Sequence, residues 1–418
     1  MPTIQGLSGL EILDSRGRPT VQATCRLASG ASGTVSVPSG ASTGRAEALE
    51  LRDGDRGRYG GLGCRQAVGH IGTTINAALQ GHDFEQTTLD QALVELDGTP
   101  TKARLGANAI LATSLAFARA AAAERGIPLY VYFAELRGRE PQRLPRPTIN
   151  LWSGGKHAGG QVAIQDVLVL PTAAHSIDEV LATTYAIYQA AIALCSETYG
   201  TRALTADEGG LAPPFPHVQA MLDDAIAAIE RAGFRPGIDV MLAIDVASSH
   251  FFRDGRYHLD QEPLTSAEMI ETLWQWVDRY PIISVEDGLA EDDWEHWPQL
   301  RARLAGRARV LGDDLLCTNP QRIQRAIDHA AADALLLKVN QVGTLSEAAT
   351  AAARAEAADW SITVSARSGE TEDSWLADLA VGWRGDHIKV GSITQSERLA
   401  KYNRLLQIEH ETGFPVAS

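Results

Sequence analysis

Three acidic residues each follow directly on a short apolar run that has the length of a buried strand. They are Asp245 in Ala-Ile-Asp, Glu286 in Ser-Val-Glu and Asp313 in Leu-Gly-Asp. Three carboxylates that converge on one place repel one another unless a cation lies among them. Hard oxygen ligands that leave room for water and substrate suit Mg²⁺. Any one of them alone would more simply be a helix cap or a surface ion pair, but the three together predict a magnesium site.

Two lysines also end apolar runs, Lys338 in Leu-Leu-Leu-Lys and Lys389 in His-Ile-Lys. A lysine at the start of a helix is usually a solvated surface residue. A lysine buried beside a second ammonium and a metal ion instead loses affinity for its proton and can act as a general base. The pair Arg367-Ser368 follows another run and offers a fork of donors for a phosphate or carboxylate. The Gly/Ser-rich loop 39–44 offers further polar groups, although such loops are more often plain linkers.

Together, these residue types suit an enzyme that removes a proton from the carbon next to a carboxylate. That C–H bond is very weakly acidic, because the resulting dianion concentrates charge on the carboxylate. Metal ions stabilise such an intermediate electrostatically, and a lysine takes the proton. A further group must help the leaving group depart, and Glu208 in the glycine-rich segment Ala-Asp-Glu-Gly-Gly is the natural candidate.

The elements that must hold these residues alternate regularly in the second part of the chain. Amphipathic helical segments separate short apolar runs, which cover residues 167–170, 240–245, 282–286, 310–313, 334–338, 362–365 and 387–390. Continuous apolar strands that alternate with helices indicate a parallel sheet covered on both faces. Repetition on this scale favours a closed, TIM-type β/α barrel, in which the C-terminal ends of the strands carry the chemistry.

The first third of the chain has a different, mixed pattern. The alternating segment 20–27 predicts a strand with one wet face, and the alanine-rich stretch 108–125 predicts a helix. A proline-rich stretch, 141–147, is the expected linker. We therefore expect two domains, residues 1–138 and residues 139–418.

The composition of the chain disfavours some classes of binding partner. The chain has 418 residues, with 37 Lys plus Arg against 52 Asp plus Glu and a formal charge of −15. Such an acidic surface argues against nucleic acid or an anionic membrane as a partner. The four cysteines have no paired spacing, which favours reduced thiols in a cytoplasmic protein. Neither a signal-peptide pattern nor an apolar stretch of membrane-spanning length is visible.

The sequence resembles the enolase (phosphopyruvate hydratase) family along nearly its whole length. The matching stretches are residues 11–17, 37–44, 47–55, 207–210, 285–287, 290–294, 335–341, 367–373 and 396–401. Several of them are long and unusual. The resemblance implies an N-terminal α+β capping domain on a modified β/α barrel, two Mg²⁺ ions per active site, and a homodimer or higher homo-oligomer.

The resemblance also implies roles for single residues. Asp245, Glu286 and Asp313 match the ligands of one magnesium, and Ser39 matches the loop residue that closes on a second magnesium and the substrate phosphate. Lys338 matches the base that removes the C2 proton of 2-phosphoglycerate. The other matched catalytic residues are Lys389 at the substrate carboxylate, Glu208 at the leaving hydroxyl and His157 on a mobile loop. The expected substrate-binding set is Gln165, Asp166, Arg367, Ser368, Ser39 and Lys156.

Departures from the family pattern gather around the leaving group. Ala366 stands where enolases carry histidine, Asp166 where they carry glutamate, and Ser153 where they carry asparagine. Lys156 replaces a residue that is usually uncharged or acidic. Gly288 and Arg18 also depart, and neutral drift explains these two easily. Loss of an imidazole at position 366 is harder to explain in this way, because one acid–base participant typically contributes about 10²–10⁴-fold to the rate.

Three functional hypotheses follow. The first is a specialised enzyme similar to the carboxyphosphonoenolpyruvate synthase of phosphinothricin-type antibiotic pathways, in which a widened pocket admits a phosphonate donor linked to a cytidine nucleotide. The second is an ordinary enolase that interconverts 2-phosphoglycerate and phosphoenolpyruvate. The third is an inactive scaffold, which is disfavoured because the metal-binding and base residues are retained.

Overall fold

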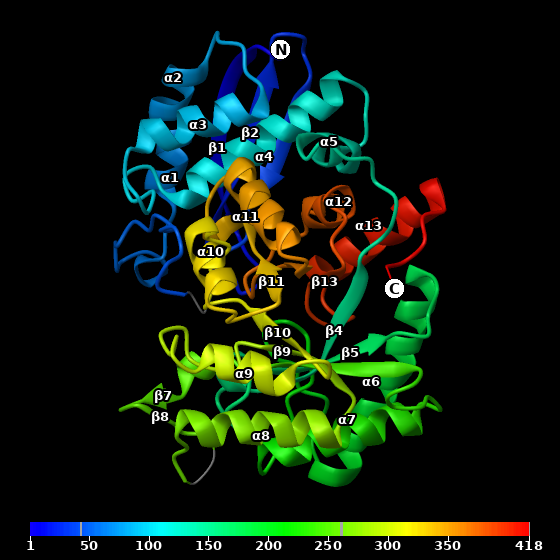
Figure 1. The fold of residues 1–418 in the computed structure, drawn as a ribbon. Coiled ribbons are helices and arrows are strands. Elements are labelled where there is room, and N and C mark those ends of the chain that lie inside the picture. The colour runs from blue at the N-terminus through cyan, green and yellow to red at the C-terminus, as the bar shows by residue number, and fades with distance from the viewer. Residues whose placement is uncertain (42–43, 260–261, 418) are drawn as a thin grey trace.

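The structure is a computed structural model that describes residues 1–41, 44–259 and 262–417 (Figure 1). Of the glycine-rich loop 39–44, Ser42 and Thr43 lie outside the described residues. An N-terminal layer of strands and helices, blue to cyan in Figure 1, lies against a barrel formed by the rest of the chain. Among the described residues, no helix is long and apolar enough to cross a bilayer.

The N-terminal layer is a three-stranded antiparallel sheet, ordered β1-β2-β3, with helices packed on one face. Its elements are β1 (Ile4–Leu13), β2 (Pro19–Leu27), β3 (Ser32–Ser36), α1 (Arg65–His70), a π-helical turn (Ile71–Ile75), α2 (Asn76–Leu79), α3 (Gln86–Asp97), α4 (Ala107–Glu124) and α5 (Leu129–Leu136).

The predicted alternation in β2 is confirmed. Val21, Ala23 and Cys25 are fully buried, whereas Gln22 and Thr24 on the opposite face are partly exposed. The buried face packs on α4, and β3 approaches the same helix closely. A Cβ atom on Gly33 would lie 2.4 Å from the backbone of Ala116, so only glycine permits this approach.

The second part of the chain is a closed barrel ordered β10-β11-β12-β13-β4-β5-β6-β9, which confirms the predicted modified β/α barrel. Its strands are β4 (Arg146–Ser153), β5 (Asp166–Pro171), β6 (Val240–Asp245), β9 (Ile282–Glu286), β10 (Arg309–Gly312), β11 (Ala334–Leu337), β12 (Ser361–Ser365) and β13 (His387–Lys389). A small hairpin, β7 (Phe252–Arg253) and β8 (Arg256–Tyr257), extends from it.

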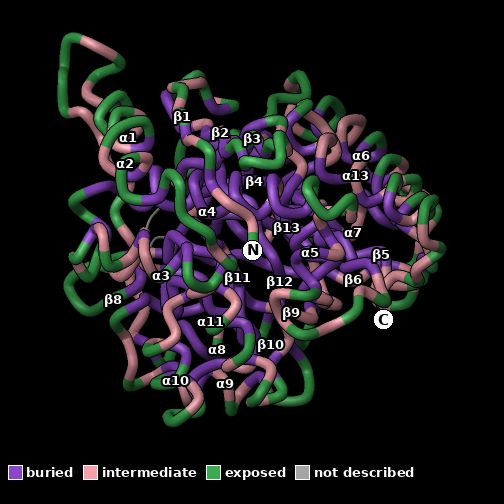
Figure 2. Tube along the Cα trace, turned by 90° about the horizontal axis from the view of Figure 1, so that it is seen from above, coloured by how far each residue is buried: buried purple, intermediate pink, exposed green. Residues whose placement is uncertain are grey.

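Helices cover the outside of the barrel. They are α6 (Ile177–Tyr199), α7 (Val218–Arg231), α8 (Ser266–Arg279), α9 (Trp297–Leu304), α10 (Pro320–Asp328), α11 (Leu345–Ala357), α12 (Trp375–Gly382) and α13 (Ser396–Thr412). Figure 2 shows the buried residues concentrated where these helices meet the strands, with exposed residues at the periphery. The main core is continuous from the N-terminal layer to the helices around the barrel, and it fixes the positions of the strand ends.

The structure corrects two expectations about the strands. The runs suggested an all-parallel sheet, but β5 is antiparallel to both β4 and β6. The segment between β4 and β5 contains only the short 3-10 helix Gly155–Ala158 and no α-helix, so it makes no helical crossover of the kind that joins parallel neighbours. The sequence also missed β4, whose first residues overlap the proline-rich stretch taken as a linker. The end of α5 at Leu136 and the start of β4 at Arg146 bracket the domain boundary, which we propose between residues 138 and 139.

Candidate active site

The strand ends bring the three predicted carboxylates to one end of the barrel. Asp245 and Glu286 end the neighbouring strands β6 and β9 and are paired in register. Glu286 pairs in turn with Leu311 of β10, so Asp313 lies just beyond the next strand. All three side chains are buried, with 3%, 3% and 8% of their surface exposed. Such a concentration of buried negative charge requires cations nearby.

The two predicted lysines meet these carboxylates directly. The Nζ atom of Lys389 donates to Asp245 Oδ2 at 2.8 Å and to Glu286 Oε2 at 2.7 Å. The Nζ atom of Lys338 donates to Asp313 Oδ2 at 2.5 Å. Burial alone would lower the pKa of each lysine, but the adjoining carboxylates more than offset it and raise both pKa values. The prediction that the pKa of each lysine is lowered is therefore wrong for this structure, in which both lysines are paired with carboxylates.

The same residues fit a magnesium ion. The Oε1 atom of Glu286 is buried and has no hydrogen-bond partner among the described residues, so one hard ligand atom remains available. Two amides orient the other carboxylates: Gln165 Nε2 donates to Asp245 Oδ2 at 3.0 Å, and Gln341 Nε2 donates to Asp313 Oδ1 at 2.9 Å. Buried carboxylates held by such outer contacts are typical of oxygen-based metal sites.

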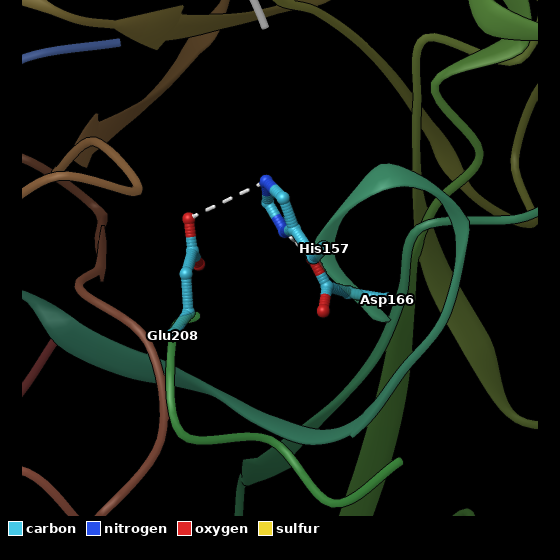
Figure 3. Close-up of side chains that lie close together, drawn as sticks. All are labelled: His157, Asp166 and Glu208. Carbon is cyan, nitrogen blue, oxygen red and sulfur yellow. Dashed lines mark ion pairs between the residues drawn. The ribbon is translucent and has the colours of Figure 1, made fainter. Parts of the chain in front are cut away.

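A separate cluster lies beside these groups, formed by His157, Asp166 and Glu208 (Figure 3). His157 lies between the two carboxylates, with Nδ1 3.4 Å from Asp166 Oδ2 and Nε2 4.0 Å from Glu208 Oε1. Burial alone would lower the pKa of His157, but Glu208 and Asp166 outweigh it and raise this pKa to about 9. The imidazole is therefore a cation at neutral pH and can hold a proton beside Glu208.

The two carboxylates of this cluster respond in opposite directions. Burial raises the pKa of Asp166. Burial acts in the same direction on Glu208, but His157 and Arg398 outweigh it and lower the pKa of this carboxyl. Neighbouring polar groups fix both side chains, because Ser153 Oγ donates to Asp166 Oδ1 at 2.5 Å and Asn150 Nδ2 donates to Glu208 Oε2 at 3.2 Å. Opposed environments of this kind distinguish proton-carrying groups from permanently charged ones.

The predicted phosphate contacts lie on the loop after β12. Arg367 is 3% exposed, and its Nη1 atom donates to Glu47 Oε2 and to Asn340 Oδ1, each at 3.0 Å. Arg398 of α13 donates to the carbonyls of Arg367 and Ser368 at 2.7 and 2.6 Å, which fixes the backbone of this loop.

Two other predicted residues lie near the edge of the site. Ser39 is buried and paired with Gly369 through backbone hydrogen bonds, while its hydroxyl donates to Glu50 Oε2 at 3.1 Å. It therefore lies beside the Arg367-Ser368 loop rather than among the three carboxylates. Lys156 is exposed, in the short 3-10 helix Gly155–Ala158 that also carries His157.

A cavity of about 20 Å³ joins these groups. It is lined by His157, Gln165, Glu208, Asp245, Lys338, Ser365, Ala366, Arg367, Ser368 and Lys389. The lining contains most of the predicted catalytic and substrate-binding residues, together with Ala366. The cavity holds little more than one water molecule, for which about 10–15 Å³ is required. Binding of a substrate therefore requires residues that line this cavity to move apart.

Comparison with protein families agrees with this geometry over both parts of the chain. A model described as the enolase N-terminal domain matches residues 4–133, and one described as the enolase C-terminal TIM barrel domain matches residues 141–417. This chain belongs to the enolase family. The family typically binds Mg²⁺ and acts on small phosphorylated carboxylates, and enolase-family members commonly form homo-oligomers.

Sequence reasoning missed several residues of this enolase-family site. Glu47, Gln341 and Arg398 lie within the stretches that carried the family resemblance, but their contacts depend on distant partners. His250, in the 3-10 helix Ser248–His250, is another. Burial and, next, Lys156 lower the pKa of His250 to about 4, so this imidazole is neutral at physiological pH. Its nearness to Asp245 in the sequence was the only available signal.

Proposed function

We propose that this protein is a magnesium-dependent enzyme that removes the C2 proton of 2-phosphoglycerate, or of a close analogue, and forms an enolpyruvate product. The support is the chain's membership of the enolase family and the set formed by buried Lys389, partly buried Lys338 and three buried carboxylates. In this proposal Lys338 takes the proton and Lys389 holds the substrate carboxylate. Because both ammonium groups are paired with carboxylates, the incoming substrate must release the Nζ atom of Lys338 from Asp313 before the lysine can act as a base.

Asp245, Glu286 and Asp313 would hold one magnesium ion, and Ser39 would contribute to a second. When bound, the metal supplies positive charge that stabilises the developing dianion on the substrate carboxylate. Arg367 and Ser368 would bind the phosphate. Since Glu47 contacts the guanidinium of Arg367 through both carboxylate oxygens, an arriving phosphate competes with an internal carboxylate for the same donors.

For the finer function we propose a carboxyphosphonoenolpyruvate synthase that uses a CMP-activated phosphonoformate. The observation that carries this proposal is the position of the departures from the family. Ser153 and Asp166, which both differ from the usual enolase residues, form a hydrogen bond with each other, and Ala366 lines the catalytic cavity. The changes are thus concentrated where the leaving group departs, and the proton-abstracting half keeps its expected residues. Ala366 leaves more room than an imidazole, and exposed Lys156 adds positive charge beside this half of the site.

One observation favours the second candidate, an ordinary enolase. His157 lies between Asp166 and Glu208 and carries a proton at neutral pH, so it can supply the acid that a histidine at position 366 would otherwise provide. In that case the protein would interconvert 2-phosphoglycerate and phosphoenolpyruvate with altered acid catalysis.

Two assays distinguish these proposals. Purified protein with Mg²⁺ and 2-phosphoglycerate is followed by the absorbance of phosphoenolpyruvate, and a rate comparable with that of a housekeeping enolase would reject the specialised function. Phosphorus NMR with 2-phosphoglycerate and CMP-phosphonoformate then tests for a new phosphonate ester, which the synthase must form with release of CMP and inorganic phosphate. The variant Lys338→Ala is the matched control, because loss of the base abolishes both reactions. If neither reaction occurs and no metal binds, the scaffold hypothesis is favoured.

We further propose that the protein is cytoplasmic and acts as a homodimer or higher homo-oligomer, as the family commonly does. Size-exclusion chromatography with light scattering measures the oligomeric state directly.

A further inference from the structure

A large cavity lies inside the barrel, below the catalytic carboxylates. Its volume is about 650 Å³. Glu286 and Lys389 form one end of it, and residues at the opposite end of the barrel, among them Arg309, Ser361 and His387, form the other. These last three residues begin β10, β12 and β13, so the cavity runs from the catalytic layer towards the N-terminal ends of the strands.

The interior of this barrel differs from the usual one. In most such barrels, layers of bulky side chains fill the interior completely. Two small apolar clusters lie within the barrel, one formed by Leu168, Leu170 and Ala243 and the other by Leu311, Ala334 and Leu336. They are separate from each other and from the main core. The barrel interior is therefore not closed by one continuous apolar plug.

Hydroxyl groups line the cavity between these clusters. Thr148 of β4, Ser284 of β9 and Thr363 of β12 all contribute to its wall. Thr148 and Thr363 are 6% and 7% exposed. A polar cavity becomes hydrated when it offers hydrogen-bonding partners and at least about 10–15 Å³ for each water, and this one is many times larger.

We propose that the interior of the barrel is a hydrated shaft that admits water and small neutral solutes from the face opposite the catalytic mouth to Glu286 and Lys389. The shaft gives the buried catalytic layer a second connection with solvent. Water can then exchange with this layer while substrate closes the small catalytic cavity. The test below measures access alone and requires no turnover, so its result is independent of the proposed enzymatic function.

Cysteine labelling tests the shaft on the full-length protein. The native cysteines Cys25, Cys64, Cys195 and Cys317 are at most 1% exposed. Burial raises the pKa of Cys25 to about 12 and, as the main cause, that of Cys64 and Cys195 to about 11. Because the thiolate is the reactive form, these native thiols react slowly. An introduced thiol can therefore be followed by mass spectrometry after exposure to methyl methanethiosulfonate.

The informative variant is Thr363→Cys, and its matched control is Val364→Cys on the same strand. Successive strand residues point to opposite faces, so residue 363 faces the shaft and residue 364, which is fully buried, faces the helices. We expect Thr363→Cys to be labelled at least ~10-fold faster than Val364→Cys, since a thiol packed in the core reacts only after local opening. Both must be labelled fully in denaturant.

The route of entry is tested by closing the lower end of the shaft. Ser361 lies two residues before Thr363 on the same face of β12 and is partly exposed, so Ser361→Phe places a bulky ring beneath the labelled thiol. We expect Ser361→Phe combined with Thr363→Cys to be labelled about 10-fold more slowly than Thr363→Cys alone. Equal labelling of residues 363 and 364, or labelling that is unchanged by the ring, would overturn the proposal. If Thr363→Cys fails to fold, Thr148→Cys with Ile149→Cys as control makes the same comparison on β4.

Discussion

The charge of His157 allows a quantitative prediction about stability and pH. Glu208 and Asp166 raise the pKa of this buried imidazole from its ordinary 6.5 to about 9. At about 1.4 kcal/mol per pH unit, this difference corresponds to ~3 kcal/mol of preferential binding of the proton by the folded state. A histidine whose pKa is raised on folding stabilises the protein fully below the pKa of the unfolded chain. That contribution is lost as the pH rises from about 6.5 through about 9.

The prediction is measured on the wild type and on His157→Gln, which keeps a polar side chain but cannot carry the charge. The free energy of unfolding is obtained from urea denaturation at pH values from 6 to 10, and the difference between the two proteins is plotted. We expect this difference to fall by ~3 kcal/mol over the interval, because only the wild type loses the proton. His175→Gln is the control, since His175 is exposed and makes no ion pair among the described residues.

NMR of the histidine ring provides a direct check, with the His157 signal assigned by its absence in His157→Gln. A difference in unfolding free energy that stays constant from pH 6 to 10, or a His157 pKa at or below 6.5, would refute the reasoning. It would mean that the desolvation of the imidazole outweighs its attraction to the two carboxylates.

Three further predictions concern catalysis and the frame of the site. Ala366→His should raise the rate of 2-phosphoglycerate dehydration by roughly 10²-fold or more, measured by phosphoenolpyruvate absorbance, because it restores an acid–base participant; an unchanged rate would show that the missing imidazole does not limit this step. Lys338→Ala should slow deuterium exchange at C2 of 2-phosphoglycerate by about 10²–10⁴-fold, measured by proton NMR in heavy water, and undiminished exchange would exclude Lys338 as the base. Asp287→Ala should lower the free energy of unfolding by about 1–3 kcal/mol per orphaned donor, because its carboxylate accepts from the backbone N–H groups of Asp313 and Asp314 at 3.0 and 2.8 Å. Asp287→Asn retains one acceptor oxygen and should lose less, and equal losses in urea denaturation would contradict this.

Much of the barrel could be predicted because each strand carries its signal locally. The run ending at Asp245 and the run ending at Glu286 coincide with β6 and β9, since a strand covered on both faces is apolar along most of its length. The direction of β5 could not be predicted in this way. An apolar run has the same composition whichever way the strand runs, and the direction of β5 is seen only in its pairing with β4 and β6.

The candidate site likewise has features that the sequence could predict and features that it could not. The sequence alone determined the family and the residue types that end the strands, because these are properties of short, unusual motifs. Only the tertiary structure showed that Ser153 bonds to Asp166, that His157 lies between two carboxylates, and that Lys338 and Lys389 are held as ion pairs. Proton affinity depends on burial and on charges within a few ångströms, and these neighbours come from strands far apart in the sequence. The sequence predicted a lowered pKa for Lys338. In the folded barrel burial acts in that direction, but Asp313 outweighs it and this pKa is raised.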